Sequence, residues 1–123
     1  MMTDDEIVGY LDDNGYPPHV VEGGRAGLLK RWRQFVEEVE TGYRHNLHNY
    51  RNDLDIRGLI RLFELDSEVA EHDTRFEELL LDRQIRVWES GADAPFWDFG
   101  YPRNSSNALR RDLVREGLLS TSD

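Results

Sequence analysis

The residues that most constrain the fold are 67–89, SEVAEHDTRFEELLLDRQIRVWE. On a helical wheel their apolar side chains form two groups that together cover more than half of the circumference, and charged residues occupy the rest. One neighbour cannot cover so wide an apolar surface, so the pattern predicts a central helix that other helices contact from two sides. The two groups are Val69, Phe76, Leu79, Leu80 and Val87, and Ala70, Leu81, Ile85 and Trp88.

The rest of the chain predicts further helices around this central one. Thr3 and Glu6 have the spacing of a capping box. Apolar residues recur at intervals of three and four, with no alternation typical of strands, so we expect an all-α fold. One domain over 1–123, a compact bundle of four to five helices, is the predicted architecture. Besides the central helix, the predicted helices are a short one that ends at Asn14-Gly15, a long one over 25–49 that passes through Gly42, one over 53–65 and one over 106–116.

An aromatic loop at 95–102 follows, PFWDFGYP, in which proline and glycine interrupt any helix. It admits two interpretations. It closes one end of the bundle with Trp97 and Phe99 buried, or it exposes Trp97 and Tyr101 as anchors for a partner. Large exposed apolar patches are rare on monomers, which favours the first interpretation. A small-molecule pocket beneath the loop, where Trp97, Tyr101 and Trp88 converge, is a further alternative.

Charge narrows the classes of partner. The chain has 25 acidic and 15 basic residues, a formal net charge of −10, and residues 64–82 hold eight acids against Arg75 alone. Such a field repels nucleic-acid phosphates and attracts basic protein surfaces, although the arginines of 103–115 form a local basic patch. Without cysteine, disulfides and thiolate-held zinc are excluded. No apolar run reaches membrane length and no basic leader begins the chain, so we expect a soluble, cytoplasmic protein.

The first functional hypothesis is a small acidic helical module that binds a basic protein partner, as an immunity protein, antitoxin, inhibitor or regulatory subunit does. The sequence contains no Gly-rich phosphate loop, GxSxG elbow or HExxH motif, which agrees with a binding role, and no cofactor is expected. The oligomeric state stays open, a homodimer included. The predicted partner-binding residues are Glu68, Glu71, Glu78 and Asp82 on the outer face of the central helix, with Trp97 and Tyr101 of the aromatic loop.

The alternative hypothesis is a metal-dependent or acid–base enzyme. Asp73 and Glu77 stand one helical turn apart, inside the apolar arc of the central helix, and His72 lies at its margin. Two carboxylates at this spacing point the same way and could hold a divalent cation or share a proton. The simpler interpretation is that these side chains pair with arginines from neighbouring helices, because a buried polar group without a partner costs about 1–3 kcal/mol. His45 and His48 are predicted to face solvent.

Overall fold

The computed structural model describes residues 3–90 and 93–120. In these residues the chain is mostly helical and carries one small antiparallel sheet of two strands, so the fold is not strictly all-α. None of the described helices is long and apolar enough to cross a membrane. The elements in order are α1 (Asp4–Asp13), α2 (Pro18–Thr41), α3 (Leu47–Leu62), a 3₁₀ turn (Asp66–Val69), α4 (Ala70–Glu77), β1 (Leu80–Arg86), a second 3₁₀ turn (Phe96–Asp98), β2 (Phe99–Pro102) and α5 (Asn107–Arg115).

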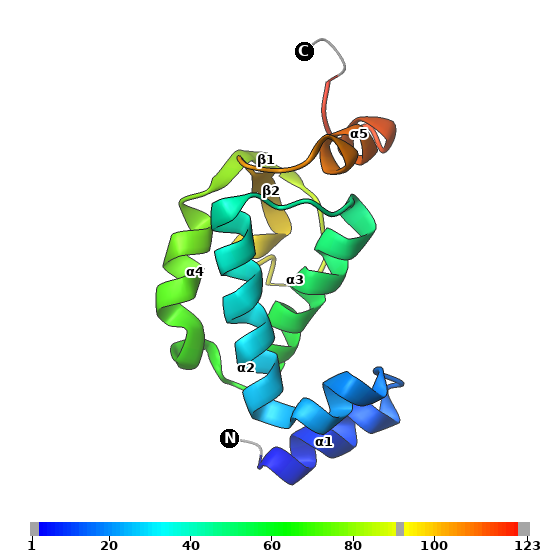
Figure 1. The fold of residues 1–123 in the computed structure, drawn as a ribbon, viewed down its shortest axis with the longest axis vertical. Helices are drawn as coiled ribbons and strands as arrows, with labels where there is room; N and C mark the ends of the chain where they lie inside the picture. Colours follow the sequence, from blue (N-terminus) through cyan, green and yellow to red (C-terminus); the bar gives the residue numbers. More distant parts are fainter. Residues whose placement is uncertain (1–2, 91–92, 121–123) are drawn as a thin grey trace.

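The helix around which the others pack is α2 (Figure 1). It contacts α1, α3 and α4, and α5 lies at the end of the molecule opposite α1. Rings from α2, α3, α4 and the α2–α3 connection meet in one buried aromatic cluster, in which neighbouring ring centroids lie 5.0–5.9 Å apart. Offset and edge-to-face contacts of this kind add to the hydrophobic stabilisation from burial. The cluster consists of Trp32, Phe35, Tyr43, Tyr50 and Phe76.

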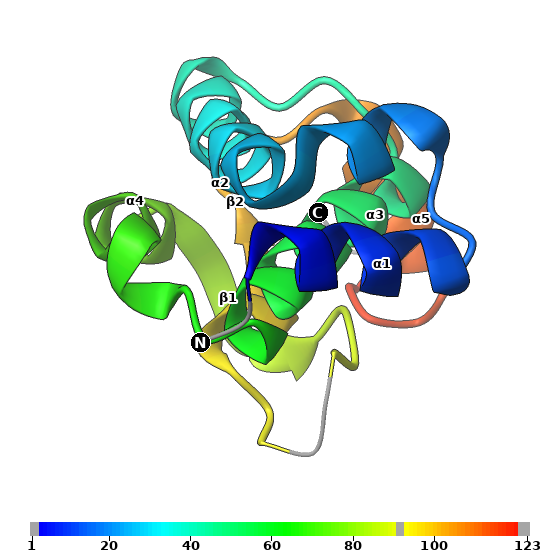
Figure 2. The same ribbon diagram turned by 90° about the horizontal axis from the view of Figure 1, so that it is seen from below.

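The first turns of α2 are bent at Gly24, which has φ 56° and ψ −148°. Beyond the bend, the Asp4 carboxylate of α1 accepts a hydrogen bond from the backbone N–H of Arg25 at 2.9 Å and so caps the rest of α2. A Cβ at Gly24 would lie 2.6 Å from that carboxylate oxygen, so only glycine fits here. α1 therefore lies side by side with the start of α2, as Figure 2 shows, and the capping box of Thr3 and Glu6 begins it as predicted.

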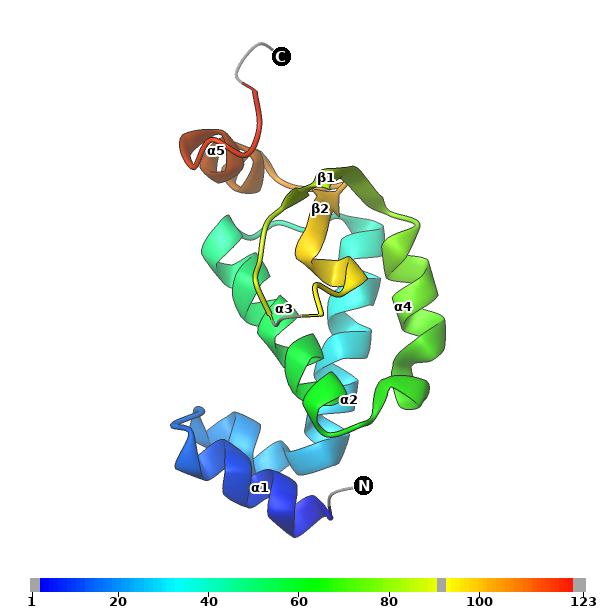
Figure 3. The same ribbon diagram turned by 180° about the vertical axis from the view of Figure 1, so that it is seen from behind.

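The prediction of a single central helix over 67–89 is wrong. Helix α4 ends at Glu77, and residues 80–86 form strand β1, which pairs with β2. The helical wheel combined two different elements. Helix α4 has an apolar period of 3.6 residues and strand β1 is extended, and plotting both patterns on one wheel produces a wide apolar arc. The strand also depends on a partner at 99–102, which no local pattern in 67–89 reveals. Figure 3 shows this hairpin on the face that Figure 1 hides.

Gly100 fixes the geometry of the hairpin. Its φ is +83°, and a Cβ there would lie 2.5 Å from the carbonyl oxygen of Leu81 on the paired strand. The register also shifts, since Leu81 pairs with Tyr101 and Arg86 pairs with Phe99. Four residues of β1, 82–85, therefore bulge opposite a single residue of β2.

The prediction that a helix runs from 25 through Gly42 to 49 is also wrong. α2 ends at Thr41, Gly42 with a φ of 130° is its C-cap, and Tyr43 forms a β-bridge with Ser105 before Asn46 caps α3. The apolar spacing continues across the break because both helices face the same aromatic cluster. Near the C-terminus, by contrast, Ser106 caps α5 close to the expected position.

Candidate functional site

The carboxylate of Asp73 belongs to a buried ionic cluster. Its two oxygens accept hydrogen bonds from Arg57 at 3.0 and 2.7 Å and from the indole N–H of Trp32 at 2.9 Å. Arg57 is only 1% exposed, forms a further ion pair with Asp66, and stacks its guanidinium 4.3 Å from the centre of the Trp97 ring. A charge this deeply buried requires such partners. Asp73 thus joins α4 to α2 and α3, and both of its oxygens are engaged within the fold.

The three predicted metal ligands do not converge. His72 lies 3.7 Å from the Glu37 carboxylate, and Glu77 lies 3.4 Å from Arg83. Over residues 3–90 and 93–120 there is no group of three or more acidic or histidine side chains with the arrangement of a metal site. The pairing of Asp73 with arginine is the simpler of the two interpretations that the sequence allowed.

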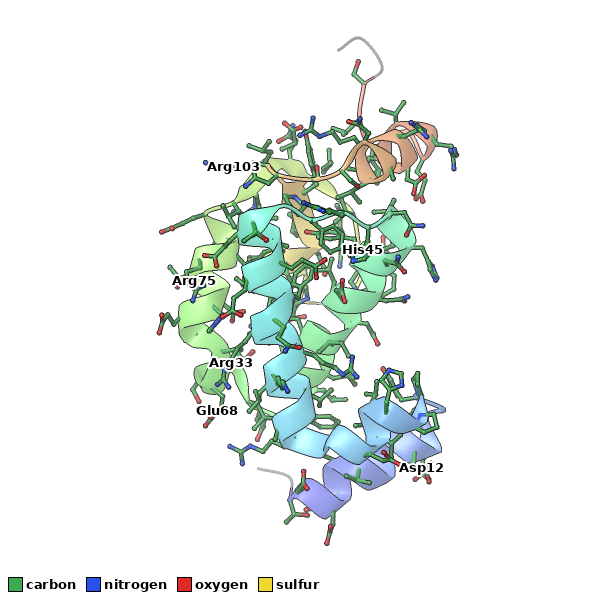
Figure 4. The ribbon with its side chains drawn as sticks, in the orientation of Figure 1. Asp12, Arg33, His45, Glu68, Arg75 and Arg103 are labelled. Carbon is green, nitrogen blue, oxygen red and sulfur yellow. The ribbon has the colours of Figure 1, made fainter. Side chains whose placement is uncertain are left out.

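The predicted partner-binding acids lie on separate elements rather than on one helical face. Glu68 is in the 3₁₀ turn, Glu71 in α4, Glu78 at the end of α4 and Asp82 in the bulge of β1. All four are exposed. Arginines already lie along much of this edge, which Figure 4 shows with Glu68, Arg33 and Arg75 labelled.

Those arginines form ion pairs with some of the acidic residues along this edge. Arg25 pairs with Glu68 at 3.4 Å, and Arg75 lies 3.9 Å from Glu71. Arg75 also makes a two-point contact with Glu40, with its Nε 2.9 Å from one carboxylate oxygen. This contact lowers the pKa of Glu40. Of the four acids predicted to face a partner, Glu68 and Glu71 are thus paired with arginines of the chain itself.

The two aromatic residues predicted to contact a partner differ in position. Trp97 is 1% exposed, with its ring beside the guanidiniums of Arg57 and Arg61 at 4.3 and 4.8 Å, so its prediction as a surface anchor is wrong. The aromatic segment instead closes the core, since Phe96 contacts both Trp97 and Phe76. Tyr101 is half-buried and lines a surface hollow together with Asp82.

A different region gathers carboxylates that form no ion pair with an arginine of the described residues. Two hollows, of about 360 and 320 Å³, share Asn52 and Asp53 and so adjoin along α3; we call the two together the α2–α3 groove. A third hollow of about 290 Å³ shares Tyr16 and Asp55 with the first. The residues that line the groove are Tyr16, Pro17, His19 and Val20 near the start of α2, Arg31 and Glu38 farther along α2, His45 of the connection, and Asn49, Asn52, Asp53, Asp55 and Ile56 of α3.

Two tyrosine hydroxyls hold the acids of this groove. Tyr43 donates a hydrogen bond to Asp53, and Tyr16 donates one to Asp55, both at 2.8 Å. Burial raises the pKa of Asp53, the Tyr43 hydrogen bond opposes that shift, and the charge of Glu38 adds to it. Burial and the adjacent carboxylates also raise the pKa values of both tyrosines, which therefore remain neutral donors. The two carboxylates are fixed in position, and their charge is left uncompensated by these donors.

The charge balance of the groove is negative. Glu38 pairs with His45 at 2.9 Å, where Figure 4 shows the imidazole between α2 and α3. His45 is half exposed, in agreement with its predicted surface position. Within the described part of the chain no ion pair includes Asp53 or Asp55, and Arg31 is the arginine that lines the groove. Sequence reasoning missed both aspartates, because they read as polar residues at a helix start and only the fold brings Tyr16 and Tyr43 to them.

Comparison with known proteins gives no match: no family model fits the sequence, and no curated protein or solved structure is significantly similar to it.

Proposed function

We propose that this protein is a binding module that accepts a basic segment of a partner protein in the α2–α3 groove. The observation that carries the proposal is the pair of half-buried carboxylates, Asp53 and Asp55, whose hydrogen-bond donors are neutral tyrosine hydroxyls. A lysine or arginine side chain in the groove would donate a charge-assisted hydrogen bond to them, adding to the more distant positive charge of Arg31. The net charge of −10 would speed the approach of such a partner.

The position of the groove refines the expectation from sequence. The acidic edge at 66–77 is cross-linked to α2 and α3 by arginines, so a partner would have to displace ion pairs to use it. In the groove a cation could reach Asp53 and Asp55 without displacing an ion pair of either carboxylate among the described residues. The tyrosine, proline and isoleucine side chains on its walls add apolar contact area for the aliphatic part of a lysine or arginine.

Binding should be linked to protons through Asp53. Because the pKa of Asp53 is raised, its ionised form costs more here than in water, and a bound cation would lower that pKa again. A basic segment therefore binds the ionised form more tightly. The affinity should rise with pH through the range in which Asp53 titrates, which lies above the ordinary value of 3.8.

The test uses short peptides of equal length in which arginine replaces serine one position at a time, with titration calorimetry to measure Kd. We expect affinity to increase with each arginine, and the double variant Asp53→Asn/Asp55→Asn to weaken it by about tenfold, the value of one lost charge-assisted contact. Asparagine keeps an acceptor for each tyrosine hydroxyl, so the fold is retained.

The matched control is Glu71→Gln/Glu78→Gln, which makes the same change in net charge outside the groove. This variant should bind the peptides as the wild type does. Equal weakening in the two double variants would show that net charge alone attracts the peptides, and the proposed site would be rejected. Chemical-shift changes on addition of peptide should fall on residues 45–56 and not on α4.

A further inference from the structure

A separate hollow of about 410 Å³ lies between the β-hairpin and α5, at the end of the molecule remote from α1. We call it the hairpin–α5 hollow. Its volume is within the range of small-molecule sites, roughly 300–1,000 Å³. Its walls include Asp82 and Tyr101 of the hairpin, Arg110, Arg111 and Val114 of α5, and Leu119 beyond it.

Two guanidinium groups give this hollow a positive side. Arg110 donates to the hydroxyl of Ser105 at 3.3 Å and to the carbonyl oxygen of Arg103 at 3.1 Å, so neutral acceptors hold it in place and leave its charge uncompensated. Arg111 is exposed and belongs to no ion pair or hydrogen bond among the described residues. In a protein of net charge −10, two such arginines in the lining of one hollow favour an anionic group there.

The hairpin adds one negative charge to the same hollow. Asp82 is exposed, with a φ of +51°, in the part of β1 that bulges away from β2. Within residues 3–90 and 93–120 no ion pair joins Asp82 to Arg110 or Arg111, although all three line the hollow. A ligand that carries both a carboxylate and an ammonium group can therefore satisfy the two walls together. A plain anion would gain the arginines but meet the charge of Asp82.

Between the two charged walls the lining is apolar. The ring of Tyr101 and the aliphatic side chains of Val114 and Leu119, all half-buried, contribute this surface. Apolar side chains with a few convergent charged groups are the usual composition of a small-molecule site. The hollow thus combines two arginines that can bind a carboxylate, one carboxylate that can bind an ammonium group, and an apolar surface.

We infer that the hairpin–α5 hollow binds a free α-amino acid with an apolar, preferably aromatic, side chain. Arg110 and Arg111 bind its α-carboxylate, Asp82 binds its α-ammonium group, and its side chain lies on Tyr101, Val114 and Leu119. This binding is independent of the basic segment proposed for the α2–α3 groove, because the two sites share no lining residue.

The experiment compares three probes of similar size by titration calorimetry and amide chemical shifts on the full chain. Phenylalanine carries both charges, 3-phenylpropionate lacks the ammonium group, and phenethylamine lacks the carboxylate. Phenylalanine should bind in the millimolar range or tighter and shift the amides of β1, β2 and α5. A probe without the ammonium group leaves Asp82 without an opposite charge, and a probe without the carboxylate leaves the two arginines without one. Either loss should weaken binding by about tenfold or more.

Two variants test the assignment without disturbing the fold. Arg111→Gln removes a guanidinium that makes no other described contact, and Asp82→Asn keeps a side chain that tolerates positive φ. Each should weaken phenylalanine binding by about tenfold, whereas Arg115→Gln, outside the hollow, should leave it unchanged. The inference is overturned if phenylalanine does not bind, if 3-phenylpropionate binds as tightly, or if the Arg115 variant loses binding equally.

Discussion

Asp73 and Asp53 are both partly buried aspartates that tie a helix to its neighbours, yet their surroundings differ. Asp73 receives two hydrogen bonds from the guanidinium of Arg57, which is itself buried. Asp53 receives one from the neutral hydroxyl of Tyr43. The first carboxylate is paired with a charge inside the fold and contributes to its stability, whereas the second has a neutral donor and lines a groove. The charge of the donor, more than burial, decides whether an acid is available to a partner.

The same contrast holds between the acid-rich residues 64–82 and the two aspartates of the groove. Residues 64–82 contain eight acids, but arginines of α2, α3 and α4 form ion pairs with Asp66, Glu68, Glu71 and Asp73. Asp53 and Asp55 stand in a stretch of ordinary composition, and no arginine of the described chain pairs with either. Local density of acidic residues is therefore a poor guide to the surface that remains negative after folding.

The largest expected effect is on stability, and it contrasts Asp73 with Asp55. Asp73→Ala removes the bidentate partner of a buried arginine and should lower the free energy of unfolding by about 3 kcal/mol or more. Asp55→Ala removes one hydrogen bond from a tyrosine and should cost about 1 kcal/mol. Urea unfolding followed by circular dichroism measures both. Equal losses in the two variants would remove the distinction between a structural carboxylate and a groove carboxylate.

A smaller effect is expected when Asp53 loses its donor. Tyr43→Phe keeps the ring in the aromatic cluster but deletes the hydroxyl, which should destabilise the protein by about 1 kcal/mol. The hydrogen bond lowers the pKa of Asp53, so its loss should raise that pKa further. Carbon-13 NMR titration of the Asp53 carboxyl group gives the shift directly. An unchanged titration would mean that the hydroxyl does not interact with the carboxylate in solution.

The smallest effect is the pH dependence that Asp53 itself contributes. Burial raises its pKa in the folded state, so the folded protein binds a proton there more readily than the unfolded chain does. This contribution to stability falls as pH rises through the titration of Asp53. Asp53→Asn removes the charge and should be more stable than the wild type near neutral pH, by less than about 1 kcal/mol, with the difference vanishing in acid. Thermal unfolding of both proteins across pH measures it; a variant less stable at neutral pH would contradict the sign.

Local chemistry in the sequence was enough to predict the ends of α1 and α5. Thr3 and Glu6 cap one helix and Ser106 caps the other with their own side chains, so the signal and the structure are a few residues apart. The arginine pairing of Asp73 was also foreseeable as a type of contact, because a polar group inside an apolar arc needs a partner.

The hairpin and the groove could not be predicted in the same way. Strand β1 exists because 99–102 pairs with it, and glycine at position 100 permits the close approach to the carbonyl oxygen of Leu81. Asp53 and Asp55 acquire their tyrosine partners from the ends of two other segments, ten and 39 residues away in sequence. Contacts between segments distant in sequence are decided by tertiary packing, and helical periodicity carries no information about them.

Asp4 and Tyr16 connect the two ends of α1 to two other helices. With ten residues it spans about 15 Å. At its start the Asp4 carboxylate is attached to the backbone of α2, and just past its end the Tyr16 hydroxyl is attached to Asp55 of α3. The short helix thus links two larger ones: a side chain holds α2 at one end of it, and a side chain holds α3 just past the other.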